Sequence, residues 1–158
     1  MENYNENMSS NNKYTNQDWN IIDYGPSPII INLYDATLQN KNFRSTLWTG
    51  DHLQLTLMSI PVGEDIGLET HPDNDQYLRV EQGEGLVRMG YDPKYIDFEH
   101  PIYEDYAFII PAGTWHNIIN TGNVPLKLHS IYSPTHHPRG TTHQTKADAA
   151  AAEHSSTI

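Results

Sequence analysis

The amino-acid sequence predicts an all-β domain, built as a sandwich or barrel of short strands. Between residues 27 and 132, apolar or alternating runs of four to eight residues recur at near-regular spacing. Stretches rich in Gly, Pro, Asn and Asp separate them, and many short strands with such punctuation are typical of all-β proteins. The runs are 29–33, 44–48, 53–60, 76–81, 86–89, 107–110, 116–119 and 126–132.

The two ends of the chain differ from this middle part. Residues 1–20 are rich in Asn, Ser, Glu and Tyr and nearly free of aliphatic side chains, so we expect a flexible polar arm. Residues 21–135 then form the β-domain. Residues 136–158 form a C-terminal loop and tail, in which the alanine-rich stretch after Thr145 predicts a short helix with that threonine as its N-cap. We predict no other helix.

Composition excludes several classes of function. The chain of 158 residues is long enough for one domain with its own core, and it has no cysteine, which excludes disulfides and thiolate metal sites. The formal charge is -11 and no cluster of Lys and Arg is visible, so we expect neither nucleic acid nor an anionic membrane as a partner. A secretory signal and a bilayer-spanning apolar run are both missing, and we expect a cytoplasmic protein.

A group of polar residues has the spacing of metal ligands. Glu69 and His71 are two residues apart, and in a strand they project from the same face. After the turn-forming stretch 72–75, Gln76 begins a run that places it on the apolar face with Leu78. The sequence therefore brings one acid, one imidazole and one amide toward the interior of the predicted β-domain.

Two stretches of the chain resemble the conserved motifs of the cupin superfamily. Residues 63–83 resemble the first motif, a glycine followed by two histidines, an acid and a second glycine. Residues 105–120 resemble the second motif, and the likeness covers roughly 27–132. The chain is similar to small stand-alone bacterial cupins of type 2, often described as sugar-phosphate-isomerase-like, and this resemblance implies a jelly-roll barrel. The second motif keeps four of its residues, Pro111, Gly113, His116 and Asn120.

By position, the resemblance implies that Glu69, His71, Gln76 and His116 hold one divalent transition metal. Glu69 replaces the family's first histidine, Gln76 replaces its glutamate, and Asp105 stands where the second motif opens with glycine. The two ligand changes compensate, because the set still carries one negative charge. Fe, Mn, Ni, Co and Zn all suit two imidazoles and a carboxylate. Gln76 either binds the metal directly or hydrogen-bonds a metal-bound water.

Other interpretations of these residues remain open. The two histidines are alternatively hydrogen-bonded barrel residues without a metal. Asp73 and Asp75, beside the ligands, are more often turn residues than ligands or bases. The histidine-rich stretch 136–143 lacks specific ligand spacing, which favours a surface loop. If it instead folds back over the barrel mouth, Arg139 and His143 become candidate substrate contacts.

The run 53–60 has two different faces. One carries Gln54 and Met58, and we expect it to line the pocket. The other carries Leu53, Leu55 and Leu57, and if exposed it would be a natural surface for a homodimer. The full set of predicted pocket residues is Gln54, Met58, Leu78, Ile118 and Asn120.

These observations support two functional hypotheses. The favoured one is a metal-dependent enzyme acting on a small oxygen-bearing substrate, with oxygenase, lyase and isomerase chemistry undecided. No separate general base is evident, so catalytic residues are not assigned. The alternative is a non-catalytic cupin module that binds a small ligand.

Overall fold

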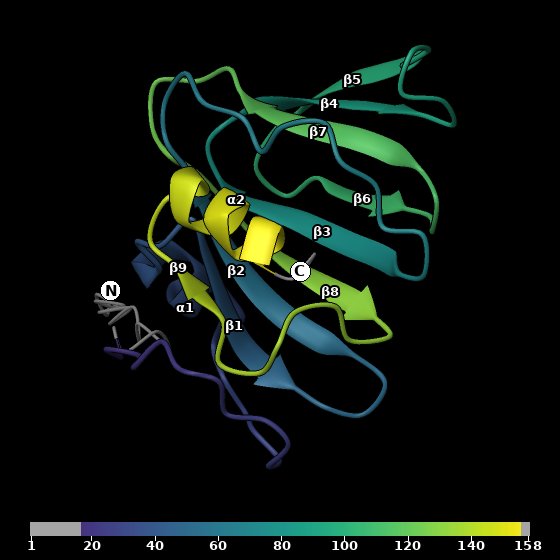
Figure 1. The fold of residues 1–158 in the computed structure, drawn as a ribbon. Coiled ribbons are helices and arrows are strands. Elements are labelled where there is room, and N and C mark those ends of the chain that lie inside the picture. The colour runs from purple at the N-terminus through teal and green to yellow at the C-terminus, as the bar shows by residue number, and fades with distance from the viewer. Residues whose placement is uncertain (1–16, 156–158) are drawn as a thin grey trace, which may run out of the picture.

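The computed structural model describes residues 17–155, which form two antiparallel sheets and two helices (Figure 1). The helices are α1 (Leu33–Gln39) and α2 (Lys146–Ser155). The strands are β1 (Arg44–Thr49), β2 (Gln54–Ile60), β3 (Asp75–Gln82), β4 (Gly85–Gly90), β5 (Phe98–Ile102), β6 (Ala107–Ile110), β7 (Trp115–Asn120), β8 (Leu126–Ser133) and β9 (Thr142–His143).

The two sheets face each other and enclose the main core. The larger sheet has the order β6-β3-β8-β2-β1-β9, and the smaller one the order β5-β4-β7 (Figure 1). Alternate residues point inward because the side-chain period of a strand is two. In β3, for example, Leu78 and Val80 are fully buried, whereas Tyr77 and Arg79 are only partly buried. The predicted all-β architecture is confirmed.

A second hydrophobic cluster covers the outer face of the larger sheet. Leu47 and Leu57 are fully buried there against Ala36 of α1. The face that carries Leu55 and Leu57 is therefore covered by the chain's own N-terminal segment, and this face is not the free dimer surface that the sequence suggested. The homodimer itself stays a prediction. Further apolar side chains packed against this cluster are Trp19, Ile21, Tyr24, Ile31 and Leu33.

Helix α1 was not predicted, and the run 29–33 is not a strand. Asn32 is the N-cap, and its side chain accepts a hydrogen bond from the Asp35 amide at 3.2 Å. An Asn that caps a helix in this way satisfies one of the free N–H groups of the first turn. The apolar run 29–33 is too short to distinguish a strand from a helix by its pattern. The Asn32 cap favours the helix.

Only the last part of the expected N-terminal arm falls within the described residues. Residues 1–16 lie outside the described residues, but 17–20, which we assigned to the arm, contact the folded domain. The Trp19 amide donates to the Gln39 side chain at 2.8 Å, and the Trp19 ring packs against the outer cluster. The C-terminal helix is confirmed as α2.

Helix α2 and β9 tie the C-terminal segment to the rim of the larger sheet. Strand β9 pairs with β1, and Ala149 of α2 is buried in the main core. Lys146 of α2 donates a hydrogen bond to the Asp65 carboxylate, which, with Asn117, holds the pKa of Asp65 below its usual value. Neither of these two helices in the described part of the chain is long and apolar enough to cross a membrane.

Asp105 has a backbone conformation that glycine favours. Its φ is 69°, in the left-handed region, which explains why related motifs carry glycine there. Asp is one of the residues that tolerate this region. Its carboxylate also accepts a hydrogen bond from Arg79 Nη2 at 2.9 Å, so the departure from the motif adds an ion pair on the outer face.

Lys127, on strand β8, caps the C-terminal end of helix α1. Its Nζ donates to the carbonyl oxygens of Leu38 and Asn40, both at 2.7 Å. Because Lys127→Met leaves these carbonyls without a donor, we expect a loss of about 1–2 kcal/mol in the free energy of unfolding. Urea unfolding measures it, with the exposed Lys41→Met as the control. Equal losses in both variants would contradict this role.

Candidate metal centre

Glu69 and His116 lie directly opposite each other at the edge of the smaller sheet. The Glu69 amide donates to the His116 carbonyl at 3.0 Å, and the His116 amide donates to the Glu69 carbonyl at 2.8 Å. Residues paired in this way across an antiparallel ladder project side chains from the same face. The segment 64–69 thus acts as an irregular extra strand along β7, and it places a carboxylate beside an imidazole.

His71 joins the pair because of a tight turn ahead of β7. Its carbonyl accepts a hydrogen bond from the Gly113 amide at 2.9 Å. Gly113 has a φ of 77°, a conformation that is strained for residues with a Cβ. The two-residue spacing from Glu69 then puts the His71 ring on the same side as the carboxylate, as the parity of the sequence predicts.

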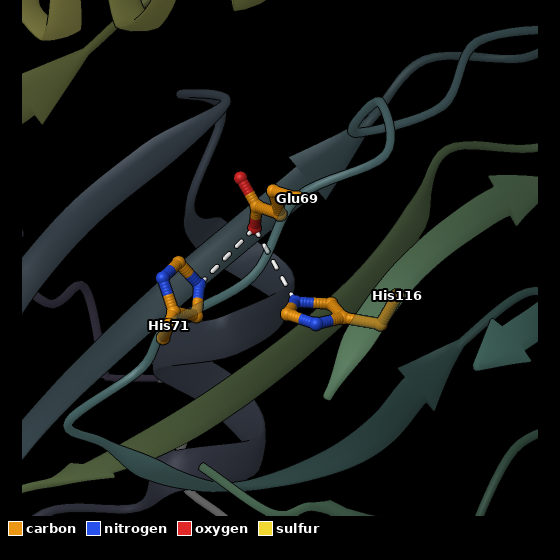
Figure 2. A group of neighbouring side chains, drawn as sticks. All are labelled: Glu69, His71 and His116. Carbon is orange, nitrogen blue, oxygen red and sulfur yellow. Dashed lines mark ion pairs between the residues drawn. The ribbon is translucent and has the colours of Figure 1, made fainter. Parts of the chain in front are cut away.

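Figure 2 shows one carboxylate oxygen of Glu69 between the two imidazole rings. Glu69 Oε1 lies 3.3 Å from His71 Nε2 and 3.5 Å from His116 Nε2. Two atoms that each bind one ion at about 2.1 Å lie about 3.0–3.4 Å apart at common coordination angles. The three side chains therefore have the mutual spacing of ligands to a single metal ion.

The tautomer of His116 strengthens this interpretation. Its Nδ1 lies 2.9 Å from the Thr114 carbonyl oxygen, which can only accept, so Nδ1 carries a proton and the neutral ring has its Nε2 lone pair toward Glu69. A backbone carbonyl behind an imidazole is the usual support of a metal-binding histidine. The Nε2 atoms of His71 and His116 are both buried and have no hydrogen-bond partner. A cation between these lone pairs and the carboxylate would satisfy all three.

Glu69 carries its negative charge in this environment. Burial alone raises the pKa of its carboxyl group, but the imidazoles of His116 and His71 and the guanidinium of Arg44 outweigh burial and hold the pKa well below its usual range. With an ion bound, the two imidazoles would supply nitrogen lone pairs and Glu69 an anionic oxygen, a donor set that suits Fe, Mn, Co, Ni and Zn.

Gln76 is oriented as the sequence predicts for a fourth ligand. Its Nε2 donates to Ser130 Oγ at 2.8 Å, and its Oε1 is buried without a hydrogen-bond partner. A buried amide oxygen without a donor is costly unless a cation or water binds it. Direct coordination by Gln76 stays a prediction, and the orientation of its amide supports it.

The five predicted pocket residues have other partners in the structure. Asn120 donates to the carbonyls of Ile60 and Val124, both at 2.9 Å. Gln54 bonds the backbone of residues 136–137 through both ends of its amide. None of the five lines the cavities described below, and their pocket role stays a prediction. Three lie in the main core, Met58, Leu78 and Ile118.

An apolar cavity of about 480 Å³ opens between the smaller sheet and β6. It adjoins the metal centre at two points, because Met89 pairs with His116 and Thr114 supports the His116 ring. No local pattern in the sequence indicates this space, since its lining combines residues of β4, β5 and β6 with the turn before β7. Other lining residues include Val87, Phe98, His100, Ile102 and Phe108.

Two residues beside the cluster were missed. The Tyr132 ring lies edge-on to His71, with centroids 5.6 Å apart, and burial raises the pKa of its hydroxyl to about 12. The His136 ring centroid lies 4.2 Å from that of His71. Parity within the run 126–132 places Tyr132 on the face of Leu126 and Leu128, a signal that could have found it. No local signal brings His136 to this position.

The acids of the turn 72–75 do not join the cluster. Asp75 accepts a hydrogen bond from the Ala112 amide at 2.9 Å, and Asp73 is exposed. Asn74, between them, is buried and bonds His136 Nδ1 at 3.0 Å through Oδ1. The turn thus positions neighbouring loops, which matches the interpretation of these acids as turn residues.

Two facing antiparallel sheets that gather two histidines and a carboxylate define a jelly-roll protein with a candidate metal centre. A model of the cupin domain matches residues 56–132. The uncharacterized protein YrkC of Bacillus subtilis is 54% identical over 153 residues, which cover 97% of this chain and 82% of YrkC. The uncharacterized protein L612 of Acanthamoeba polyphaga mimivirus is 46% identical over 112 residues, which cover 70% of this chain and 68% of L612.

A solved structure agrees with these matches. The crystal structure of BH2720 from Bacillus halodurans is 60% identical and superposes with a TM-score of 0.82, covering 83% of this chain and 99% of BH2720. The chain belongs to the cupin family.

Proposed function

We propose that this cupin is an enzyme that uses one divalent transition metal, Fe, Mn, Ni, Co or Zn, to act on a small oxygen-bearing substrate. One observation carries the proposal. Glu69, His71 and His116 bring a carboxylate and two buried imidazole nitrogens without hydrogen bonds within ligand distance of one another. A metal bound there would polarise a substrate oxygen or, as Fe(II), activate dioxygen.

The protein groups around this position have separable roles. Glu69, His71 and His116 hold the ion and leave coordination positions for water or substrate, as two histidines and one carboxylate do elsewhere. Gln76 offers its free amide oxygen as a further ligand. The adjoining apolar cavity gives a substrate a water-poor approach beside Met89. Oxygenase, lyase and isomerase chemistry all fit this arrangement.

A non-catalytic role is the second candidate. The largely apolar lining of the 480 Å³ cavity favours it, since such a space retains a small ligand without requiring chemistry. The two candidates differ in the behaviour of the metal. Exchangeable metal-bound water favours catalysis, and a metal without an open position favours binding alone.

Metal content tests the proposal most directly. We expect the wild-type protein, refolded or dialysed with each of the five metals, to retain about one ion per chain of at least one of them. Because Glu69→Ala and His116→Ala each remove a ligand, they should retain little, and His52→Ala, in an exposed turn, should match the wild type. Elemental analysis after gel filtration measures this. Equally low metal in the wild type and both ligand variants would overturn the proposal.

Catalysis needs a second measurement on the metal-loaded protein. Oxygen uptake by the Fe(II) form with a panel of diols and catechols tests the oxygenase option, and product analysis under nitrogen tests the lyase and isomerase options. Silence in both assays, with metal bound, would favour the ligand-binding role.

The proposal also includes a cytoplasmic location and a homodimer. We further propose that each chain divides into residues 1–20, 21–135 and 136–158. Light scattering of the eluting protein tests the dimer. A monomer at micromolar concentration would contradict it.

A further inference from the structure

Arg44 lies inside the domain, in contrast to most arginines. It begins β1 and pairs with Met58 of the main core on one side and with His143 of β9 on the other. Neighbours across a sheet that are in register point to the same face, so the side chain projects between the two sheets. It is only 3% exposed.

Among residues 17–155, the guanidinium group of Arg44 forms no ion pair within 4.0 Å, and the charge of Glu69 acts on it only from further away. Its Nε is buried without a hydrogen bond. Its guanidinium carbon lies 5.5 Å from the centroid of the Phe43 ring. A buried charge that is not paired is strongly unfavourable, so such a group is expected to meet an anion in the working protein.

A cavity of about 290 Å³ lies beside this group, under the C-terminal segment. Two more of its lining side chains present buried nitrogens without partners, His137 Nε2 and His143 Nδ1. Three unsatisfied nitrogens thus border one space. Its remaining walls come from His136, Pro138, Thr141, Ala152 and Glu153.

The electrostatics of this cavity favour an anion over a second cation. Burial first, and then the positive charge of Arg44, lower the pKa values of His137 and His143, and the carboxylates of Asp148 and Glu153 oppose this shift at His143. The neutral rings can each donate one N–H. Among the described residues, no group of three metal-ligand atoms gathers here. A guanidinium fork flanked by N–H donors is the arrangement that binds carboxylate or phosphate.

The cavity adjoins the metal centre. His136 lines the cavity, and its ring lies 4.2 Å from that of His71. The charge of Arg44 also acts on the Glu69 carboxylate, which places the guanidinium within electrostatic reach of the ligands. The His136 ring thus stands between the cavity and His71 of the cluster.

We propose that Arg44, with His137 and His143, binds an anionic group, carboxylate or phosphate, of the substrate that is handled at the metal centre. This inference rests on the proposed function for its link to the metal and names the substrate class as small organic anions. The fold brings the anion site together from β1, β9 and the loop at 136–143, and the Gln54 amide fixes that loop through the backbone of 136–137.

Anion binding is tested on protein freed of metal over a chelating resin, since a soluble chelator is itself an anion. Thermal unfolding is followed with increasing inorganic phosphate or malonate, against sodium chloride of equal ionic strength. We expect at least one of the two anions to raise the midpoint of wild-type unfolding saturably, above the effect of chloride. The anion that acts distinguishes a phosphate from a carboxylate group.

Arg44→Met keeps the length of the side chain and removes its charge. We expect it to weaken anion binding at least tenfold and, without anion, to unfold no lower than the wild type, because it removes an unpaired buried charge. Arg44→Lys should bind with intermediate affinity, and the exposed Arg88→Met should respond as the wild type does. If Arg44→Met unfolds early, isothermal titration with phosphate and malonate on Arg44→Lys decides instead.

The two proposals fail in different ways. If neither anion acts on the wild type, or if both Arg44 variants respond unchanged, the anion site is wrong while the metal content of the protein can still be one ion per chain. If anion binding depends on Arg44 but the metal analysis fails, the cavity stands as an anion site and its link to the metal is wrong.

Discussion

Saturation with a divalent transition metal is expected to raise the free energy of unfolding by about 3–4 kcal/mol, at free metal 100 to 1,000 times the dissociation constant. The reason is that Glu69, His71 and His116 form one site only in the folded chain, where the Nε2 atoms of both histidines are buried and unpartnered. Urea unfolding at pH 7.5 of resin-treated protein, with and without Mn, Co, Ni or Zn chloride, measures this difference.

Two substitutions, at His116 and Gln76, measure how much each side chain contributes to metal binding. His116→Gln removes a buried imidazole ligand and should abolish the stabilisation by metal, whereas His52→Gln, in an exposed turn, should leave it intact. Gln76→Leu should weaken metal binding about tenfold if the Gln76 amide oxygen is a direct ligand or orients a bound water, in keeping with the usual cost of losing an outer contact. A full metal response in His116→Gln would place the ion elsewhere.

The sequence predicted those parts of the fold that follow from local alternation. In β3, the inward set Gln76, Leu78 and Val80 is the set that parity assigns, because the period of two is a property of each strand alone. Strand β5 lacks that signal. It carries Pro101, and four of its five residues are exposed, as suits an edge strand.

The metal cluster was predictable for a different reason. Its residues lie in two short motifs, and the tight turn at Gly113 and the spacing of Glu69 and His71 fix their geometry locally. Arg44 and His137 have no such signature, since an arginine at the start of a strand is ordinarily solvated. Their meeting depends on β9 and the loop at 136–143 folding back over the rim, which the sequence offered only as an alternative. His143 lines the cavity and Arg139 is exposed, while a substrate contact at either residue stays a prediction.

Acidification from pH 6.5 to pH 4.5 is expected to cost the metal-free protein about 2–3 kcal/mol through His137 alone. Burial, followed by the positive charge of Arg44, lowers the pKa of His137 from 6.5 to about 2, and the charge of Glu69 opposes this shift. Below pH 6.5, His137 therefore becomes protonated in the unfolded chain but stays unprotonated in the folded chain. The contribution of His137 to the free energy of unfolding is fully present above pH 6.5 and is lost progressively as the pH falls toward 2.

Urea unfolding at pH 7.5, 6.5, 5.5 and 4.5 isolates this contribution when the wild type is compared with His137→Gln. The substitution spares the backbone bond from residue 137 to Gln54, so it should flatten the pH dependence by close to one proton. His52→Gln should keep the wild-type slope, and a parallel slope in His137→Gln would refute the assignment. An anion bound at Arg44 would lie beside His137 and favour its protonated form. Phosphate or malonate should therefore reduce the acid loss in the wild type but not in Arg44→Met, which couples this titration to the anion site by a second route.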